Sequence, residues 1–370
     1  MEKFLPEICT IQYGFPFDSA KFSISEGMPL IRIRDVVRGY SETFTTEDYK
    51  EEYVVNKDDL LIGMDGEFNI AKWGATPALL NQRVCRLLPT SEVDKNYLFY
   101  FMPSALKRIE EKTPFVTVKH LSAKELNKVR VPLLPLEAQH RIVSLLDKVS
   151  DLIAKRRAQM DKLDLLVKSR FVEMFGDIDT HITAEEACEV IVDCPHSTPK
   201  YIGKNKIYPA IRTSEIKNGQ IDWTSMLYVD AEEYKQRTKR LVPLEGDIVY
   251  AREGTYGDCV ILPKQHRFCL GQRTMLFRPN YNICTSEYLH QVLRSDVVKR
   301  QADESNAGST VPHVNVADAK KFAFPLPSLE KQKEFSNFVE RTDKSKLTIQ
   351  QSLDKLEILK KALMQKYFGE

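Results

Sequence analysis

Glutamine stands next to arginine at two places in the chain, Gln82-Arg83 and Gln272-Arg273. Arginine forms bidentate hydrogen bonds to guanine, glutamine forms them to adenine, and both side chains also contact phosphates. These pairs could therefore read or grip a nucleic acid. A scaffold role, such as an arginine that pairs with a core carboxylate, explains a recurring pair equally well.

Other polar residues with suitable side chains lie in predicted loops and strand ends. His196, Ser197 and Thr198 form a turn near which a phosphate could bind. The basic run 235–240 is typical of a solvated helix face but could also grip phosphates. The remaining candidates for contact with a nucleic acid are Arg32, Arg34, Asn69, Lys72, Lys200, Arg212, Lys239, Arg240, Arg252, Thr255, Tyr256 and Arg267.

Signatures of catalysis and of cofactor binding are missing from the sequence. There is no Gly-x-x-x-x-Gly-Lys loop, no Gly-x-Gly-x-x-Gly after a strand and no Asn/Asp-Pro-Pro-aromatic run. Glu215-Ile216-Lys217 resembles half of a nuclease metal site, but no suitably placed Pro-Asp precedes it. The seven histidines and seven cysteines lack metal-ligand spacing. We therefore predict no catalytic residue, no metal and no cofactor.

Composition sets wide limits on what the chain can be. Its 370 residues are enough for two or three domains, and the formal net charge is only +2. Residues 1–131 carry 18 basic and 19 acidic side chains, and residues 179–325 carry 19 of each. Composition alone thus gives no argument for nucleic-acid binding. An odd, scattered set of cysteines and the lack of a long apolar run predict a cytoplasmic protein with free thiols and no membrane span.

A long internal repeat is the main sign of organisation. Residues 117–177 align with residues 310–370 at a constant offset of 193, and 16 of the 61 positions are identical. Ordinary composition would give only about four identities. The spacing is far longer than a solenoid unit of about 20 to 50 residues. The chain therefore holds two copies of one module.

Each copy begins with a mixed part that reads as strands, turns and a few helices. Residues 29–35 correspond to residues 209–215, and their alternation predicts a strand with Arg32 and Arg34 on one face. Asp65-Gly66 and Glu253-Gly254 predict a matching turn in both copies. Trp73 and Trp223 are expected to pack in the core or shape the surface rather than to stack on nucleic-acid bases.

Each copy ends in a helical part with an apolar seam at heptad spacing. The second seam is weak over the polar stretch 342–346 and could shift onto Leu347. A helix of about 40 residues needs a partner for such a seam, and the repeated tail can supply it as an antiparallel partner. Two separate helices, each packed on its own domain, are the alternative. The predicted seam residues are Ile142, Leu146, Val149, Ile153, Met160, Leu163, Val167, Ile349, Leu353, Leu356 and Leu363.

The predicted fold class is α+β, with two similar mixed domains separated by two long helices in an antiparallel coiled coil. We expect a first domain over residues 1–131 and a central helical region over 132–178. A second domain would cover 179–325, and a C-terminal helical region 326–370.

The link into each helix carries a family resemblance. Residues 131–139, Val-Pro-Leu-Leu-Pro-Leu-Glu-Ala-Gln, and residues 324–332, Phe-Pro-Leu-Pro-Ser-Leu-Glu-Lys-Gln, are similar to the link motif of type I restriction-modification specificity (S) subunits. Residues 194–199, Cys-Pro-His-Ser-Thr-Pro, resemble a turn that opens a target-recognition domain of that family. Residues 12–17 resemble another opening motif of the family. Cys194 and Ser328 depart slightly from these motifs.

The resemblance implies a function. Each mixed domain would be a target-recognition domain that reads one half of a split, asymmetric double-stranded DNA sequence, and the coiled coil would set the gap. The subunit itself would be no enzyme, but it would recruit methyltransferase (M) and endonuclease or translocase (R) subunits. Two domains that read different bases should differ, so the recurring Gln-Arg pairs then favour a scaffold role or a phosphate contact. Basic helix residues at 155–157 and 360–361 are candidates for docking M subunits, and a plain solvated helix face explains them equally well.

Three alternatives remain open at this stage. The chain could be the specificity subunit of a related system with a fused nuclease-methyltransferase. It could be an enzyme, a nuclease or methyltransferase, with an unrecognised motif. It could also be a structural spacer that binds only proteins. Methyl transfer or DNA cleavage by the isolated chain would identify the enzyme, and absence of sequence-specific DNA binding would identify the spacer.

Overall fold

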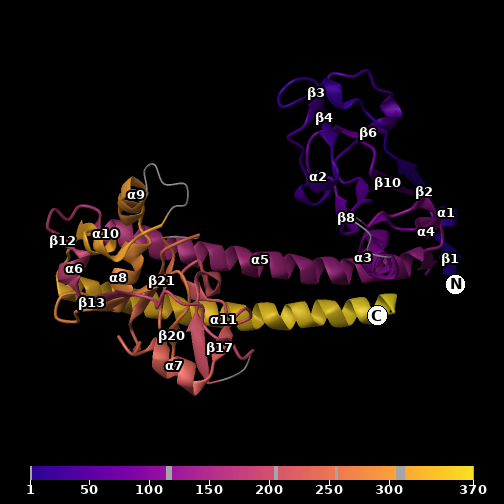
Figure 1. Cartoon of the computed structure of the whole chain (residues 1–370). Helices are drawn as coiled ribbons and strands as arrows, with labels where there is room; N and C mark the ends of the chain where they lie inside the picture. Colours follow the sequence, from indigo (N-terminus) through magenta and orange to yellow (C-terminus); the bar gives the residue numbers. More distant parts are fainter. Residues whose placement is uncertain (1, 114–118, 204–206, 255–256, 306–312, 370) are drawn as a thin grey trace. The chain divides into compact units, whose positions relative to one another are not determined.

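The computed structural model describes residues 2–113, 119–203, 207–254, 257–305 and 313–369. The chain forms two compact units. Unit 1 comprises residues 1–157 with 351–370, and unit 2 comprises residues 158–350. Two long helices contribute to both units, α5 (Leu136–Phe175) and α11 (Leu329–Phe368), each of 40 residues (Figure 1).

Unit 1 contains a four-stranded antiparallel sheet in the order β2-β10-β7-β8. Its strands are β2 (Cys9–Tyr13), β10 (Val84–Pro89), β7 (Leu60–Gly63) and β8 (Asn69–Lys72). The side chains of Leu60, Leu61 and Ile62 are fully buried, because both faces of the central strand β7 are covered. Helix α3 (Lys95–Lys112) supplies Tyr97, Phe101 and neighbouring residues to this core.

A second sheet of unit 1 has five short strands in the order β3-β5-β4-β9-β6. Strands β4 and β9 run parallel within it. The strands are β3 (Phe22–Ser23), β5 (Phe44–Thr45), β4 (Met28–Ile31), β9 (Ala78–Leu80) and β6 (Val54–Val55). The shorter elements of the unit are β1 (Glu2–Phe4), α1 (Leu5–Ile8), the 3₁₀ turn Ser19–Lys21, α2 (Ile33–Arg38), the 3₁₀ turn Glu51–Tyr53, α4 (Ala123–Asn127) and β11 (Arg130–Pro132).

Unit 2 repeats this plan. Its four-stranded antiparallel sheet has the order β13-β21-β18-β19, and β14 pairs in parallel with β20 in a second sheet of order β17-β14-β20. The strands are β13 (Cys188–Asp193), β21 (Thr274–Pro279), β18 (Ile248–Ala251), β19 (Cys259–Ile261), β17 (Leu227–Val229), β14 (Tyr208–Ile211) and β20 (Cys269–Leu270). The four-stranded sheets of the two units have the same strand order, and each second sheet contains one parallel pair, as expected of a duplication.

The remaining elements of unit 2 are mostly short. They are β12 (His181–Thr183), α6 (Ala184–Ala187), the 3₁₀ turn Thr213–Glu215, β15 (Ile216–Lys217), β16 (Gln220–Ile221), α7 (Ala231–Arg237), α8 (Ser286–Leu293), α9 (Asp296–Ser305), α10 (Val316–Lys320) and β22 (Ala323–Pro325). In Figure 1 helices α8, α9 and α10 gather beside the four-stranded sheet, whereas α7 lies with β17 and β20. All seven cysteines of the chain are buried and free.

The long helices are antiparallel in both units. In unit 1 the start of α5 packs on the end of α11, where Val149 and Ile153 meet Leu353. In unit 2 Arg170 of α5 lies 3.0 Å from Glu334 of α11. The predicted α+β class with two similar domains and an antiparallel helix pair is confirmed. Of the predicted seam residues, Ile142, Leu146, Val149, Ile153, Val167 and Leu353 are buried, and Met160, Leu163, Ile349, Leu356 and Leu363 are half-buried.

The predicted shift of the second seam onto Leu347 is wrong. Leu347 is 61% exposed, and its neighbour Lys346 turns inward instead. The side chain of Lys346 is only 11% exposed, and its Nζ lies 2.6 Å from Asp164 of α5. A paired charge therefore occupies the weak stretch of the seam, which a count of apolar residues could not reveal.

A buried glutamine explains why the link motif recurs. Gln139 and Gln332 are fully buried at the first turn of each long helix. The amide nitrogen of Gln139 donates to the carbonyls of Glu92 and Leu134, and its oxygen accepts the backbone N–H of Asp94. Gln332 makes the same three bonds with Ile283, Pro327 and Thr285. Each glutamine thereby fastens a helix to the mixed domain beside it.

A phenylalanine at the end of each long helix closes the core of its unit. Phe368 packs against Tyr97 and Phe101 in unit 1, with ring centroids 5.2 and 6.0 Å away. Phe175 occupies the equivalent position in unit 2, with Tyr288 at 5.0 Å and Phe335 at 5.5 Å. Both phenylalanines are buried, so each mixed domain packs on the last turn of one helix and the first turns of the other.

Candidate nucleic-acid interface

One carboxylate organises a cationic cluster in unit 2. Asp193 ends strand β13, and its Oδ2 lies 3.0 Å from His196 Nε2 and 3.4 Å from Arg252 Nη1. Its Oδ1 lies 3.3 Å from Arg240 Nη1. Two guanidinium groups thus share one carboxylate, which leaves a local excess of positive charge. We call His196, Arg240, Arg252 and Asp193 the Asp193 cluster.

The turn that follows Asp193 is held by a buried arginine. Arg237, the last residue of α7, is 5% exposed and donates hydrogen bonds to the carbonyls of Leu270, Ser197 and Pro195. Gln272 donates from its amide nitrogen to Thr198 Oγ1 at 2.8 Å. His196, Ser197 and Thr198 themselves are exposed. The structure therefore brings the predicted turn, Gln272 and Arg240 to one surface, whereas Arg252 pairs with Asp193 while only 8% exposed.

The Gln-Arg pairs occupy the same unusual place in both units. Arg83 and Arg273 each have left-handed backbone, with φ of 73° and 62°. The Arg83 carbonyl accepts the N–H of Met64, and the Arg273 carbonyl accepts that of Arg252. Each arginine therefore turns its carbonyl towards the strand next to it and projects its side chain outward, with 54% and 65% of that side chain exposed.

An acidic residue of the neighbouring turn accompanies each of these arginines. In unit 1, Asp65 Oδ2 lies 3.6 Å from Arg83 Nε, and Asp65 Oδ1 lies 2.5 Å from His120 Nδ1. In unit 2, Glu253 Oε2 lies 3.0 Å from Arg273 Nε, and Glu253 forms a β-bridge with His313. We call these two sets the paired arginine sites. The sequence showed that each residue recurs, but not that the three meet.

The prediction that Arg32 and Arg34 share one face of a strand is wrong. Strand β4 ends at Ile31, Arg32 precedes the first turn of α2, and Arg34 lies inside that helix. The cause is Asp35, whose carboxylate accepts the backbone N–H of Arg32 at 2.9 Å and so starts a helix. Both arginines remain exposed, and Arg34 donates to Thr43.

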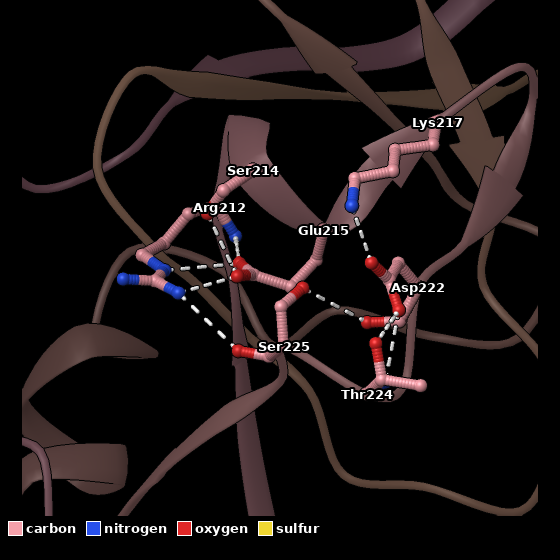
Figure 2. A network of polar contacts seen from close by, with 7 residues as sticks. All are labelled: Arg212, Ser214, Glu215, Lys217, Asp222, Thr224 and Ser225. Carbon is pink, nitrogen blue, oxygen red and sulfur yellow. Dashed lines mark hydrogen bonds and ion pairs between the residues drawn. The ribbon is translucent and has the colours of Figure 1, made fainter. Parts of the chain in front are cut away.

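Arg212 occupies the corresponding position of unit 2 and faces inward. Its backbone N–H and guanidinium donate to the fully buried carboxylate of Glu215, which also accepts from Ser214 (Figure 2). The Glu215 carboxylate raises the pKa of Arg212. In the same network Asp222 accepts from Lys217 and Thr224, which hold the pKa of that carboxyl well below its usual range. Arg212 therefore pairs with Glu215, and Lys217 with Asp222.

This network also removes the half nuclease site considered from the sequence. Glu215 faces a guanidinium rather than an open cation position. Within the described ranges, no group of three or more histidine, cysteine, aspartate or glutamate side chains could hold a metal ion. The core Arg–carboxylate pairing proposed as an alternative for Arg83 belongs instead to Arg86 with Asp59, and to Arg278 with Asp247.

The other predicted residues are scattered. Lys72 lies over the ring of Phe99, 4.9 Å from its centroid, and Asn69 donates to the carbonyl of Glu67. Lys200, Lys239, Arg267 and Gln82 are exposed without being gathered into either set above. Thr255 and Tyr256 lie outside the described residues. Trp73 is buried in the core, whereas Trp223 is 41% exposed and packs on His266 with centroids 4.5 Å apart.

Three organising residues were missed by sequence reasoning. Asp193 and Asp65 carry no motif of their own, and Arg237 looked like its exposed neighbours in the basic run. One signal was available for Asp65, because it precedes a turn glycine just as Glu253 does. Nothing comparable pointed to Asp193, since Tyr13 occupies the equivalent end of strand β2.

A cleft of about 950 Å³ lies within unit 2, between the mixed domain and the helices. His290 lines it together with Asp343 and Lys346. The ring of His290 contacts the carbonyl of Cys259 at 2.9 Å. Burial, with a smaller effect of Arg294, lowers the pKa of His290 to about 4. The imidazole is therefore neutral in the folded protein at neutral pH.

We predict that acid destabilises unit 2 through His290. The unfolded chain binds this proton near pH 6.5, whereas the folded protein binds it near pH 4, so stability falls as pH drops between these values. Between pH 7 and pH 5 the loss should be about 2 kcal/mol. Urea midpoints of wild type and His290→Gln at both pH values check this. A wild type whose acid loss equals that of the variant would contradict the assignment.

Comparison with known proteins defines the class. The model of the type I restriction modification DNA specificity domain matches residues 1–162 and 188–358, which is most of the chain. The chain therefore belongs to the type I restriction-modification DNA specificity family, whose members are generally not catalysts. In the part of the chain that is described, no helix has the length and apolar character to span a membrane.

Particular relatives cover nearly the whole chain. The type I restriction enzyme EcoBI specificity subunit of Escherichia coli is 27% identical, over 98% of this chain and 84% of its own. The MjaVIII specificity subunit of Methanocaldococcus jannaschii is 21% identical over 91% and 87%. The fold is similar to the crystal structure of a type I S subunit from M. genitalium, with TM-score 0.58, 13% identity and coverage of 100% and 96%.

Proposed function

We propose that this chain reads a bipartite, asymmetric sequence on double-stranded DNA and recruits methyltransferase and endonuclease subunits to it. The observation that carries the proposal is the duplication. Each unit has a four-stranded sheet of the same order, the same left-handed arginine and the same buried glutamine at the first turn of a 40-residue helix. One scaffold used twice fits a protein that performs one kind of recognition at two places.

The two units differ in side chains of the candidate interface, as we expect if each unit recognises a different base sequence. Unit 2 has the charged Asp193 cluster at the end of β13, whereas unit 1 has Tyr13 at the equivalent end of β2. Arg252, which pairs with Asp193 in unit 2 and is only 8% exposed, corresponds to the apolar and equally buried Met64 of unit 1, so unit 1 has no such support for a charged cluster. Base sequence is read by side chains that match the pattern of donors and acceptors on base edges. Different side chains on similar scaffolds therefore favour recognition of two different half-site sequences, which we call words.

The long helices are suited to set the gap between those words. A helix of 40 residues is about 60 Å long. Half-sites separated by one turn of DNA, about 34 Å, present the same groove face. Two linked readers gain effective concentration only when their separation matches that of the half-sites. We therefore assign the helices the role of ruler.

The chain itself has no catalytic role in this proposal. Methyl transfer and cleavage belong to the recruited M and R subunits. A related system, with nuclease and methyltransferase fused in one partner, would use the same specificity subunit and remains the alternative. The similarity to type I subunits over nearly the full length favours the first assignment.

Exposed aliphatic pairs on the long helices are the proposed docking points for M subunits. Leu165 and Leu166 on α5 are 63% and 48% exposed, and Ile358 and Leu359 on α11 are 70% and 45% exposed. The two pairs correspond at the repeat offset of 193, so one lies in each unit. Two equivalent apolar patches fit two copies of one partner. The basic helix residues predicted to dock M subunits are less available for a partner, because Arg157 pairs with Glu357 at 2.8 Å.

We predict that Leu165→Gln with Leu166→Gln removes one of two bound M subunits. Glutamine keeps the helix but loses the apolar contact, so the affinity at that patch should fall about 30-fold or more. Native mass spectrometry of the complex with M reports the stoichiometry. The control is Leu152→Gln, since Leu152 is 46% exposed but corresponds to Ser345 in the repeat. Unchanged stoichiometry in the double variant would refute these docking points.

Selection from a random duplex library tests the function as a whole. The full chain bound to M subunits should enrich two short, unlike words at one fixed spacing. The base pairs in the gap between the two words should show no sequence preference. Enrichment of one continuous word, or none, would reject the proposal. Methyl transfer or cleavage by the chain without partners would support the enzyme alternative.

A further inference from the structure

We propose that Arg83 and Arg273 make one and the same contact with a DNA phosphate, once in each half of the target. The inference rests on the proposed DNA-reading function and adds a sequence-independent clamp to it. Asp65 and Glu253 are positioning residues in this clamp. They hold the guanidinium groups and do not themselves touch DNA.

The backbone at both arginines is unfavourable for the residue type. Left-handed φ costs an L-residue with a long side chain about 1 to 2 kcal/mol, and only glycine, asparagine and aspartate adopt it readily. The four described residues of this kind other than glycine are Asp58, Asn218, Arg83 and Arg273. Two of them thus follow the usual preference, and the two arginines do not. A turn alone would be served better by glycine or asparagine, so the arginine side chain is needed for itself.

Each carboxylate pairs with its arginine at Nε, which leaves both Nη atoms of Arg273 and one Nη atom of Arg83 open to a ligand. In both units the acidic oxygen is nearest to Nε rather than to the two Nη atoms, at 3.6 Å from Arg83 and 3.0 Å from Arg273. Neither Nη atom of Arg273 has a hydrogen-bond partner among the residues that the structure describes, and Arg83 Nη1 is 3.3 Å from His120. A guanidinium fixed at Nε presents its Nη atoms to a ligand with little loss of side-chain entropy.

The turn that carries each carboxylate is built alike. Gly66 follows Asp65 and Gly254 follows Glu253, with φ of 77° and 72°. The N–H of Gly66 donates to the carbonyl of Lys119, next to His120. Asp65 and Glu253 also bridge to His120 and His313, respectively. Acid and arginine are thus locked by backbone contacts in both units, which makes a preorganised site.

A phosphate is the ligand that fits this duplication. The surroundings of the two sites differ, with Met64 beside Arg83 and Arg252 beside Arg273. Residues that read bases should differ between domains that read different words, whereas a contact to the DNA backbone is the same at every sequence. An exposed, outward guanidinium that recurs at the same left-handed position in both units therefore matches a phosphate. The nearby carboxylate reduces the net charge, so the contact should orient the DNA more than it attracts it.

The test compares DNA binding by the full chain, in complex with M subunits, between 50 and 200 mM salt. The variants are Arg83→Asn and Arg273→Asn, because asparagine accepts left-handed backbone and removes only the guanidinium. Each should weaken binding about 3- to 10-fold, equally on a selected target and on random duplex DNA. Each should also lower the slope of log affinity against log salt by up to about 0.9. The control Arg130→Gln removes an equally exposed charge from β11 of unit 1.

The variant Asp65→Asn tests whether Asp65 acts by positioning Arg83 or only through its negative charge. Removal of a negative charge should strengthen DNA binding if Asp65 acts only through its field. The clamp predicts weaker binding, because Arg83 loses its anchor at Nε. A gain in affinity would therefore overturn the positioning role.

The outcomes distinguish the clamp from the proposed function. If wild type binds no DNA with M present, the proposed function fails. If wild type binds and both arginine variants behave like Arg130→Gln, the clamp is overturned and the function stands. A loss confined to the selected target would also overturn the clamp, because it would make the arginines base readers.

Discussion

Removal of one heptad from each long helix is expected to shorten the gap in the recognised DNA sequence by up to about three base pairs. The segments are residues 158–164 of α5 and 344–350 of α11. Asp164 and Lys346, which pair at 2.6 Å, leave together, and the exposed Leu165-Leu166 pair stays. Seven residues shorten a helix by about 10.5 Å, and DNA rises 3.4 Å per base pair. A whole heptad keeps the seam in phase.

Selection from a random duplex library gives the gap directly. Both words should stay unchanged while only their spacing decreases. The matched control removes residues 158–164 alone. That variant leaves an unpaired stretch in α11 and should lose specific binding, because the two helices no longer match in length. A double deletion that keeps the original gap would mean that the helices do not set it.

Phe175→Ala is expected to destabilise unit 2 by about 3 to 5 kcal/mol, and Phe368→Ala to do the same to unit 1. Phe175 is 1% exposed among Phe171, Tyr288 and Phe335, so its loss leaves a cavity where α5, α11 and α8 meet. Tyr288 would also lose one of its two ring contacts, keeping the contact with Phe171, while its hydroxyl stays bonded to Pro325. The result should be a mixed domain released from its helices.

Hydrogen exchange resolved by residue is the proper measurement, since two units need not unfold in one step. Phe175→Ala should raise exchange in β13, β18 and β21 and leave β7 and β10 protected. Phe368→Ala should produce the reverse pattern. Val172→Ala is the control, because Val172 is 66% exposed on the same helix and should change stability by less than about 0.5 kcal/mol. Equal effects of either substitution on both units would contradict the account of two separate cores.

The fold could be predicted from the sequence because its signals are periodic and occur twice. A proline-free heptad pattern from Glu137 to Phe175 specifies a long helix, and its recurrence at 193 residues supplies a partner. Such patterns survive without knowledge of tertiary contacts. The error at Leu347 arose where the pattern stops, because a charge pair between Lys346 and Asp164 fills the seam there.

The site could be predicted only in part, because its geometry depends on contacts between distant residues. Alternation of side chains suggested a strand through Arg34, but Asp35 caps a helix there through a single carboxylate. His196, Arg240 and Arg252 are 56 residues apart at most, and only the folded chain shows that Asp193 joins them. The repeat identified Arg83 and Arg273 from the sequence, whereas their left-handed backbone can be seen only in the folded structure.

Mapping of modified bases in the genome of cells that express this chain with M subunits would show whether the two units recognise separate half-sites. We expect one motif made of two short, unlike words with a fixed unspecific gap. Replacement of residues 179–325 by the second domain of another specificity subunit should change one word and leave the other word intact. A change in both words, or a single uninterrupted motif, would contradict the account.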